Sequence, residues 1–327
     1  MKPTFHAAPV NGPFEDPCIF IRILREARAL LFDLGYIGRL SASSVLKVSD
    51  VFITHTHIDH FFGFDMLLRN SLRREAPLRI FGPEHIIRCV EGKLNGYIWN
   101  LIRDYPLRIE VFEVRGDTLH HASFHAGNSF RRVDNGAAAF SGTLLEDPLF
   151  TIKATTLTHD IPVMAYSLEE ELHININKAK LQERRLPVGP WLADFKRALR
   201  EGAPGDRVFD TGAGRHALDE LRDIAMVTRG QKVSYVTDVS PTEENIARAV
   251  SFVRGADLLF CEAYFMERDR DRACERHHLT AALAGRIARA AAVGSLEVMH
   301  ISPKYRDEVE PLYREAMDAF RGVSSGS

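Results

Sequence analysis

The stretch from Asp50 to Asp65, DVFITHTHIDHFFGFD, concentrates side chains that can bind a metal ion. Directly after a short apolar run it carries His55, His57, Asp59 and His60. Alternate residues of an extended segment point to the same side, so the first two imidazoles are expected to lie on one side of the chain. Neutral imidazole and carboxylate groups suit zinc or a similar divalent metal. The density of the pattern favours a metal site over a coincidental cluster.

Three more candidate ligands, His159, Asp238 and His300, each follow an apolar run elsewhere in the chain. Taken singly, His159 would be interpreted as a core histidine and Asp238 as a turn or capping residue. Open α/β sheets, however, present side chains from their strand ends to a common crevice. The shared placement of these residues therefore predicts that the fold brings them to the histidine-rich stretch.

The candidate metal ligands together exceed what one tetrahedral ion needs: they are His55, His57, Asp59, His60, His159, Asp238 and His300. Such a set suits two divalent ions that share a bridging carboxylate. A pair of ions about 3.5–4 Å apart is the arrangement that activates water and clamps phosphoryl oxygens. Zinc fits these ligands best, and manganese and iron stay open, because nitrogen and oxygen ligands accept all three.

The other histidines outside this pattern are interpreted as surface or loop residues: His6, His85, His120, His121, His125, His173 and His216.

Strands and helices alternate in both halves of the chain, which predicts an α/β layered fold. Strands are expected at residues 17–35 (two, joined near 25–28), 50–54, 77–83, 107–114, 149–159, 163–170, 232–240, 256–265 and 295–302. Helices are expected after His60, after Glu84, and over 242–253, 278–292 and 305–320. The helix at 242–253 has a threonine cap followed by acidic residues, which is typical of a helix start.

The segment 170–230 differs in character, because it is basic and contains two proline-bearing turns. We expect one domain over residues 1–327, into which 170–230 is inserted as an arm or a lid, with a helix over HALDELRDIAM (216–226). Its cations could contact phosphates or form a solvated helix face, and both interpretations stay open. They are Lys178, Lys180, Arg184, Arg185, Lys196, Arg197 and Arg200.

Composition excludes several classes of protein. The chain has 327 residues and a formal net charge of −2, so a nucleic-acid role would need a local basic patch. Its 4 cysteines are scattered, which argues against a disulfide scaffold and favours the cytoplasm. No apolar run reaches the roughly 18 residues of a membrane span, so we expect neither secretion nor membrane insertion.

The motifs resemble those of the metallo-β-lactamase fold, and in particular its ribonuclease Z branch of phosphodiesterases. The stretch THTHIDH, preceded by a strand that ends in Asp33-Leu34-Gly35, resembles the fold's metal motif. THDIPVMAYSLEE, YVTDVSP, CEAYF, HHLTA and MHISPKY resemble later segments of the branch, and LPVGPW resembles the Gly-Pro element of its RNA-binding arm. The resemblance, from about Cys18 to Phe320, implies an αββα sandwich.

By the same resemblance, one metal would bind His55, His57 and His159, and a second would bind Asp59, His60 and His300. Asp238 would bridge the two ions. Asp59, Glu262 and His278 are expected to be catalytic, with the glutamate orienting a histidine that protonates the leaving 3′ oxygen. His277 competes for that role, and His278 is favoured because it matches the family's His-x-Thr element.

The implied function is a binuclear phosphodiesterase, with precursor tRNA as the substrate of a 3′-processing endonuclease and a homodimer as the assembly. Two segments expected near the site differ from the family pattern: HAAPVNGPFEDP, where the family has a Gly-Thr-rich loop after its first strand, and Tyr36-Ile37-Gly38-Arg39 after Asp-x-Gly. The alternatives are a hydrolase of small phosphodiesters or other esters, and a metal-stabilised binding protein without turnover.

Overall fold

The computed structural model describes residues 4–24, 26–170 and 172–323, which fall into two compact units. The first unit comprises residues 1–144, 152–168 and 232–327, and the second comprises 145–151 and 169–231. Each unit has a hydrophobic core of its own.

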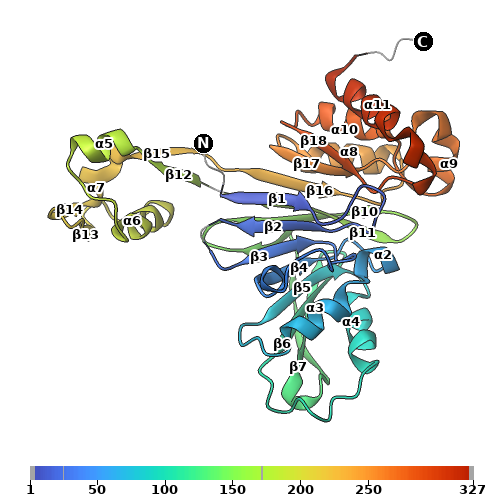
Figure 1. Ribbon diagram of the computed structural model, residues 1–327, viewed down its shortest axis with the longest axis horizontal. Helices are drawn as coiled ribbons and strands as arrows, with labels where there is room; N and C mark the ends of the chain where they lie inside the picture. Colours follow the sequence, from blue (N-terminus) through green and yellow to red (C-terminus); the bar gives the residue numbers. More distant parts are fainter. Residues whose placement is uncertain (1–3, 25, 171, 324–327) are drawn as a thin grey trace. The chain divides into compact units, whose positions relative to one another are not determined.

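An eight-stranded mixed sheet forms one layer of the first unit (Figure 1), and its strands follow one another in chain order. They are β1 (Phe5–Pro9), β2 (Ile19–Ile23), β3 (Ala29–Phe32), β4 (Val48–Phe52), β5 (Leu78–Pro83), β6 (Arg108–Arg115), β7 (Thr118–His125) and β8 (Arg132–Ala139). Strands β3 to β6 run parallel, whereas the flanking pairs are antiparallel hairpins. The parallel strands send their carboxyl ends to one edge, where the histidine-rich stretch begins.

A six-stranded sheet forms the second layer, in the order β18-β17-β16-β11-β10-β9. Its strands are β9 (Thr143–Glu146), β10 (Thr151–Thr158), β11 (Pro162–Glu169), β16 (Lys232–Val236), β17 (Leu258–Glu262) and β18 (Leu296–Met299). Strands β16, β17 and β18 are parallel neighbours, so the residues after them emerge side by side.

Buried aromatic rings join the two sheets. Phe32 of β3 stacks on Tyr166 of β11 with ring centroids 5.7 Å apart and on Tyr235 of β16 at 5.8 Å. The hydroxyl of Tyr166 donates to the carbonyl of Ile53 at 2.5 Å. The hydroxyl of Tyr235 likewise has a partner, since it donates to Oδ2 of Asp33 at 2.7 Å. Both rings therefore fill the space between the sheets while their hydroxyl groups stay hydrogen-bonded, as buried tyrosines require.

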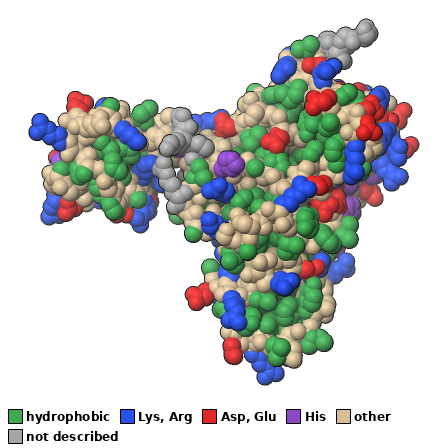
Figure 2. All heavy atoms as spheres, viewed as in Figure 1, with side chains coloured by type: hydrophobic (Ala, Val, Ile, Leu, Met, Phe, Trp, Pro, Cys, Tyr) green, Lys and Arg blue, Asp and Glu red, His purple; other side chains and the backbone are tan. Residues whose placement is uncertain are grey.

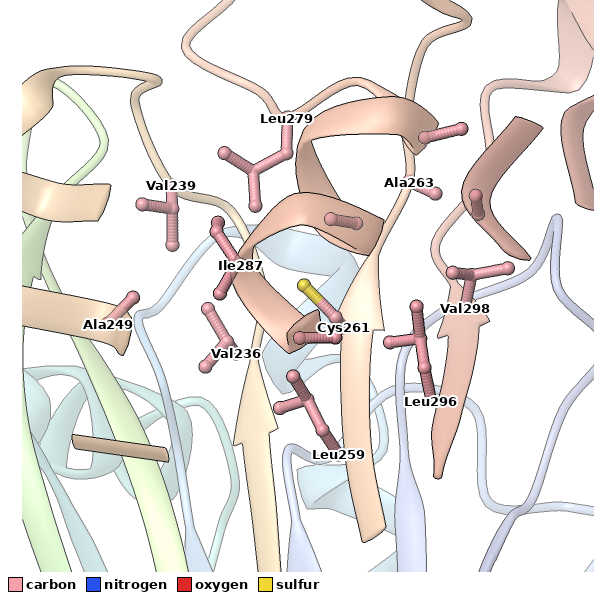
Figure 3. Close-up of a cluster of buried hydrophobic side chains, with 14 of the residues drawn as sticks. Val236, Val239, Ala249, Leu259, Cys261, Ala263, Leu279, Ile287, Leu296 and Val298 are labelled. Atoms are coloured by element: carbon pink, nitrogen blue, oxygen red, sulfur yellow. The ribbon is translucent and has the colours of Figure 1, made fainter. Parts of the chain in front are cut away.

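Helices cover the outer face of each sheet. The first sheet carries α1 (Ala42–Val45), α2 (Ile58–Phe61), α3 (Phe64–Ser71), α4 (Ile86–Asn95) and the short η1 (Ala126–Asn128). The second carries α8 (Glu243–Val253), η3 (Glu267–Asp269), α9 (Arg270–Glu275), α10 (Ala281–Ala290), η4 (Pro303–Glu308) and α11 (Val309–Arg321). Figure 3 shows Ile287 of α10 among Val236, Leu259 and Cys261 of the sheet beneath it. The layers are therefore helix, sheet, sheet, helix, as the resemblance implied.

The second unit is a small α/β element with a core of its own. Strands β12 (Leu172–Ile176) and β15 (Ala225–Arg229) pair antiparallel at its two chain ends. Between them come α5 (Lys178–Glu183), α6 (Trp191–Arg200), the hairpin β13 (Val208–Asp210) and β14 (Arg215–Ala217), α7 (Leu218–Leu221) and η2 (Arg222–Ile224). Its core is Leu181, Leu186, Trp191, Phe195, Ala198, Phe209, Leu218, Leu221 and Ile224.

Two expectations from the sequence were wrong. Residues 216–226 do not form one helix, because Arg215–Ala217 and Ala225–Arg229 pair as strands and leave only a short helix between them. His173 is not a surface or loop residue: it lies buried in β12, and its Nδ1 lies 3.1 Å from the carboxylate of Glu170. A polar partner three residues away lets this histidine be buried.

The other expected elements are present, with ends shifted by a few residues. The cap predicted at Thr242 is confirmed, since its side chain accepts from the backbone N–H of Asn245 at 3.2 Å. Within the part of the chain that the structure describes, no helix is both long and apolar enough to cross a membrane.

Candidate metal centre

The side chains predicted as metal ligands converge at the carboxyl-terminal edge of both sheets. His55 and His57 lie in the segment between β4 and α2, and Asp59 and His60 lie within α2. From the second sheet, His159 directly follows β10, Asp238 lies two residues after β16, and His300 directly follows β18. Parallel strands that end together place these residues in one place although the sequence separates them widely.

A first group consists of His55, His57, His159 and Asp238, whose ligand atoms all lie within 4.8 Å of one another. The Nε2 atoms of His55 and His159 lie 3.4 and 3.8 Å from Oδ2 of Asp238. The rings of His55 and His57 are nearly perpendicular, with centroids 4.3 Å apart. Three imidazoles and a carboxylate around one point match a tetrahedral site for a divalent ion.

A second group consists of Asp59, His60 and His300, within the same mutual distance. Oδ2 of Asp59 lies 3.5 Å from Nε2 of His60 and 3.4 Å from Nε2 of His300. Asp238 reaches this group as well, because its Oδ2 lies 3.2 Å from Nε2 of His60 and its Oδ1 lies 2.7 Å from Nδ1 of His300. This aspartate therefore stands between the two groups.

The buried ring nitrogens fit a metal ion. Nε2 of His55 and Nε2 of His60 are both buried, and neither has a hydrogen-bond partner among the described residues. Burying such an atom without a partner costs roughly 1–3 kcal/mol, so each needs another ligand. An ion coordinated by these nitrogens and by the neighbouring carboxylates supplies it. The types and positions of these donors therefore fit divalent metal binding.

The electrostatics of the bare site reflect its crowding. Burial and the neighbouring His60 lower the pKa of His55 to about 2, so this imidazole is neutral and ready to bind a cation. Burial also disfavours a charge on His60, but the carboxylates of Asp238 and Asp33 more than offset it and raise its pKa. Burial would raise the pKa of Asp238, yet His300 and His60 hold it well below its usual value.

The backbone is strained at two of the candidate ligands. Asp238 has φ of 52° and His300 has φ of 51°, in the left-handed region that L-residues with side chains rarely adopt. Such conformations cost about 1–3 kcal/mol and persist where the surrounding structure enforces them, often at functional sites. His300 directly follows β18 and Asp238 lies two residues after β16, so both strained residues lie where the chain leaves a strand.

Asp33 holds one of the candidate ligands from behind. Its Oδ2 lies 2.7 Å from Nδ1 of His60 and accepts a hydrogen bond from the hydroxyl of Tyr235 at 2.7 Å. Its Oδ1 accepts from the backbone N–H of Thr54 at 2.7 Å. A carboxylate on one ring nitrogen fixes the tautomer that leaves the other nitrogen for the metal. Sequence reasoning did not assign this role, although an aspartate at the strand end in Asp-x-Gly was a signal for it.

The glycine of that same Asp-x-Gly turn is required by close packing. A Cβ on Gly35 would stand 2.6 Å from Cβ of Asp16 and 2.8 Å from the carbonyl oxygen of Asp59. No larger residue fits without moving the turn that carries Asp59. The turn thus positions the second ligand group through its backbone.

The imidazole of His159 is held through its second ring nitrogen, as that of His60 is by Asp33, but its partner is a backbone carbonyl. Its Nδ1 lies 2.7 Å from the carbonyl oxygen of His277, which leaves Nε2 toward Asp238. The side chain of His277 itself lies 3.2 Å from the hydroxyl of Ser240. The backbone of His277 therefore supports a ligand, while its imidazole has a separate partner.

Glu262 and His278 form a pair at the edge of the cluster. Nδ1 of His278 lies 2.8 Å from Oε2 of Glu262, and the other oxygen of this fully buried glutamate accepts from the backbone N–H of Val239 at 2.6 Å. Because Glu262 engages Nδ1, Nε2 is the ring nitrogen that is left to face a substrate. The nitrogen and oxygen atoms that this pair could offer to a metal lie within 4.8 Å of those of Asp238 and His300.

The two segments that depart from the family pattern are joined to each other in the structure. The side-chain amide of Asn11 donates to the carbonyl oxygens of Asp16 and Tyr36, each at 2.8 Å, and Glu15 pairs with Arg39 at 2.7 Å. The backbone N–H of Ile301 donates to the carbonyl of Pro13 at 2.7 Å. These segments therefore form one connected wall next to His300.

Comparison with known proteins places this chain among ribonucleases and metal-dependent hydrolases. A protein named Ribonuclease Z from Deinococcus radiodurans is 29% identical over 298 residues, covering 90% of this chain and 87% of the relative. One of the same name from Synechococcus sp. is 30% identical over 296 residues, covering 88% of this chain and 81% of the relative. No protein-family model matches the chain.

Among solved structures, the metallo-β-lactamase fold protein YhfI from Bacillus subtilis is similar in fold. It superposes with a TM-score of 0.54 at 17% identity, covering 98% of this chain and 94% of that one. The metallo-β-lactamase fold expected from the sequence is confirmed.

Proposed function

This chain belongs to the ribonuclease Z family, and from that premise we propose that it is a two-metal phosphodiesterase that processes the 3′ end of precursor tRNA. That it is a metal-dependent hydrolase of the ribonuclease Z type follows from its relatives and fold. The substrate, the number of ions and their identity are the proposed part. The observation that carries the proposal is Asp238, whose carboxylate faces ligands of both groups.

In this proposal the first ion is held by His55, His57 and His159, and the second by Asp59, His60 and His300, with Asp238 between them. Zinc is the proposed metal, since imidazole nitrogen and carboxylate oxygen are its ordinary ligands. When bound, the two ions would activate water for attack and neutralise charge on the phosphoryl oxygens.

The residues of the chain would then manage the leaving group. The oxygen of a water that has lost one proton to solvent would form a new bond to phosphorus, and the bond from phosphorus to the 3′ oxygen would break. His278 donates the proton on Nε2 to that oxygen, so that it leaves as a hydroxyl rather than an alkoxide. Glu262 holds Nδ1 and stabilises the charged imidazole before the transfer. Burial of Glu262 keeps this orientation fixed.

We further propose that residues 170–230 serve as an RNA-binding arm within a single domain of residues 1–327. Figure 2 shows Lys and Arg side chains on the face of the second unit that is in view. Several of its cations are committed to local acids: Lys180 and Arg184 pair with Asp223, and Arg197 pairs with Asp194. Lys178 and Arg185 are exposed and have no ion pair within the described ranges, so they are the better candidates for phosphate contacts.

A homodimer located in the cytoplasm is part of the same proposal. The resemblance supports it, since in that family the arm of one copy serves the active site of its partner. Light scattering coupled to size-exclusion chromatography measures the assembly directly, and a monomer at micromolar concentration would contradict it.

The altered segments around Asn11 and Tyr36 favour a second candidate function, the hydrolysis of small phosphodiesters or other esters. They form a wall beside His300 that differs from the family pattern. This candidate keeps the metals and the chemistry and changes only the substrate.

One experiment separates the two. The metal-loaded protein is incubated with precursor tRNA and with bis(p-nitrophenyl) phosphate. Endonucleolytic cleavage of the tRNA at the 3′ end of the mature sequence supports the proposed function. Hydrolysis of the small ester alone rejects tRNA as the substrate. Hydrolysis of neither by fully metal-loaded protein would instead point to a binding protein without turnover.

A further inference from the structure

Tyr264 lies directly against the candidate proton donor. Its ring is stacked on the imidazole of His278, with centroids 4.0 Å apart and planes 8° from parallel. The same ring meets His300 nearly edge-on, at 5.2 Å and 65°. The tyrosine therefore contacts both the candidate proton donor and a candidate ligand of the second group, so a change in its position would affect both.

The backbone around Tyr264 is tied to the segments that carry these two histidines. The carbonyl of Tyr264 accepts from the N–H of Ser302 at 3.1 Å, two residues after His300. Next to it, Phe265 accepts from the N–H of Ala281 at 2.7 Å and donates to the carbonyl of Leu279 at 3.3 Å. The ring is half-buried and packs against the hydrophobic core that includes α10, so turning it away from His278 would lose that packing.

A stacked ring supplies an orientation that the glutamate cannot. The hydrogen bond between Nδ1 of His278 and Glu262 fixes the position of one ring atom. It leaves some freedom in the tilt of the imidazole plane. A parallel aromatic face sets the plane of the ring, and the two contacts together fix the direction of Nε2. The electron-rich face of an aromatic ring also attracts a cation, which suits an imidazole that is charged before it gives up its proton.

We propose that Tyr264 is a positioning residue for proton donation by His278. The inference rests on the proposed function, since it concerns the departure of the leaving oxygen in phosphodiester hydrolysis. A weakly basic oxygen, such as that of p-nitrophenol, leaves without a proton, whereas phenol and the ribose 3′ hydroxyl need one. Loss of the stack should therefore slow the reaction more as the leaving oxygen becomes more basic.

The test compares three variants on three substrates. Tyr264→Phe keeps the ring and Tyr264→Leu removes it, while Tyr313→Leu changes another half-buried tyrosine that packs on the same core. The substrates are bis(p-nitrophenyl) phosphate, diphenyl phosphate and precursor tRNA. We expect Tyr264→Leu to lower kcat about 10–100-fold on the last two and little on the first, a part of the 10²–10⁴-fold that general acid catalysis contributes.

In the same measurements Tyr264→Phe and Tyr313→Leu should stay close to the unmodified protein, with metal content equal in all variants. KM should change little in Tyr264→Leu, because the stack affects proton donation to the leaving oxygen and not the binding of the substrate. The loss should vanish in a His278→Ala background, since residues that act as a unit are not additive.

Three results would overturn the inference. Equal losses on all three substrates would mean that the ring supports the metal ligands through His300. A loss that persists in the His278→Ala background would mean that the ring acts independently of the acid. Unchanged kcat of Tyr264→Leu on diphenyl phosphate and tRNA would show that the stack has no role. If the unmodified protein cleaves none of the esters, the proposed function fails and this inference fails with it.

Discussion

The two units of this protein hold their polar side chains by different physical means. In the first, five of the candidate ligands are buried, and His60 and His159 have a second partner on the ring nitrogen that faces away from the cluster. In the second, the candidate phosphate contacts are partly or fully exposed, and Arg184 and Arg197 pair with acids at the surface. Exposed charges are screened by salt, whereas buried groups are screened much less.

This difference predicts that the first unit carries out the reaction and that the second unit contributes to binding of the substrate. The metal centre should act on any phosphodiester that reaches it, at a rate that depends little on ionic strength. The second unit should matter only for a substrate with many phosphates, and its contribution should fall steeply as salt increases. The following predictions sharpen or break this separation, beginning with the largest effect.

Removal of the metal by a chelator should abolish hydrolysis of both bis(p-nitrophenyl) phosphate and precursor tRNA, because both depend on the same centre. It should also lower the melting temperature, since the buried nitrogens of His55 and His60 lose their ligand. Saturation at about 1,000 times the dissociation constant stabilises a protein by roughly 4 kcal/mol. Differential scanning fluorimetry with metal analysis measures both. Retained tRNA cleavage in the chelated protein would break the comparison.

Replacement of His278 by alanine should lower kcat on precursor tRNA by roughly 10²–10⁴-fold and leave metal content intact. The reason is that the leaving 3′ oxygen loses its proton donor. His277→Ala is the matched control, because it removes the neighbouring imidazole but keeps the backbone carbonyl that His159 contacts. It should cost far less. A larger loss for His277→Ala than for His278→Ala would reverse the assignment of the acid.

Replacement of Asp33 by asparagine should weaken metal binding by about 10–100-fold, as loss of a group behind a ligand typically does. The carboxylate on Nδ1 of His60 is lost, and the imidazole is no longer held in the tautomer that the metal needs. Titration of the apo protein with zinc measures the change. Asp65→Asn removes a half-buried carboxylate that pairs with Lys93, away from the candidate ligands, and should leave zinc affinity unchanged. Equal affinities of the two variants would show that Asp33 has no such role.

The smallest effect is expected for Lys178→Ala combined with Arg185→Ala. Binding of precursor tRNA should weaken, and the slope of log K against log salt should fall by about one for each phosphate that the protein no longer neutralises. Hydrolysis of the small ester should not change. The matched control is Lys180→Ala with Arg184→Ala, whose cations already pair with Asp223. If this control loses as much RNA affinity as the first pair, the local ion pairs do not decide which cations bind RNA.

The sequence was most informative where local pattern and chemistry coincide. The strand before His55 and the helix that begins near Asp59 followed from apolar spacing, and the dense run of donors indicated a metal directly. The placement of His159, Asp238 and His300 after apolar runs predicted that they would meet, since strand ends share an edge. Side-chain type and periodicity are local properties, and the residues themselves carry them.

The sequence was least informative where a residue's neighbours are far away in the chain. The burial of His173 depends on the pairing of β12 with β15, some 55 residues later. Glu170 in its own segment gives the buried ring a partner, but does not by itself indicate that the strand pairs. The helix expected over 216–226 failed for the same reason, since strand pairing at both ends overrode the local apolar spacing. Long-range pairing outweighs intrinsic helix propensity, which is a weak preference.

By itself, the sequence predicted metal binding, the alternating α/β elements and the side chains that the structure brings together at the candidate centre. Only the tertiary structure decided that Asp33 holds His60 from behind, that Glu262 engages Nδ1 of His278, and that Tyr264 lies flat on that imidazole. The reason is that donor types are fixed residue by residue, whereas the direction of each donor atom is fixed by hydrogen bonds and ring contacts between strands that are adjacent only in the folded sheets.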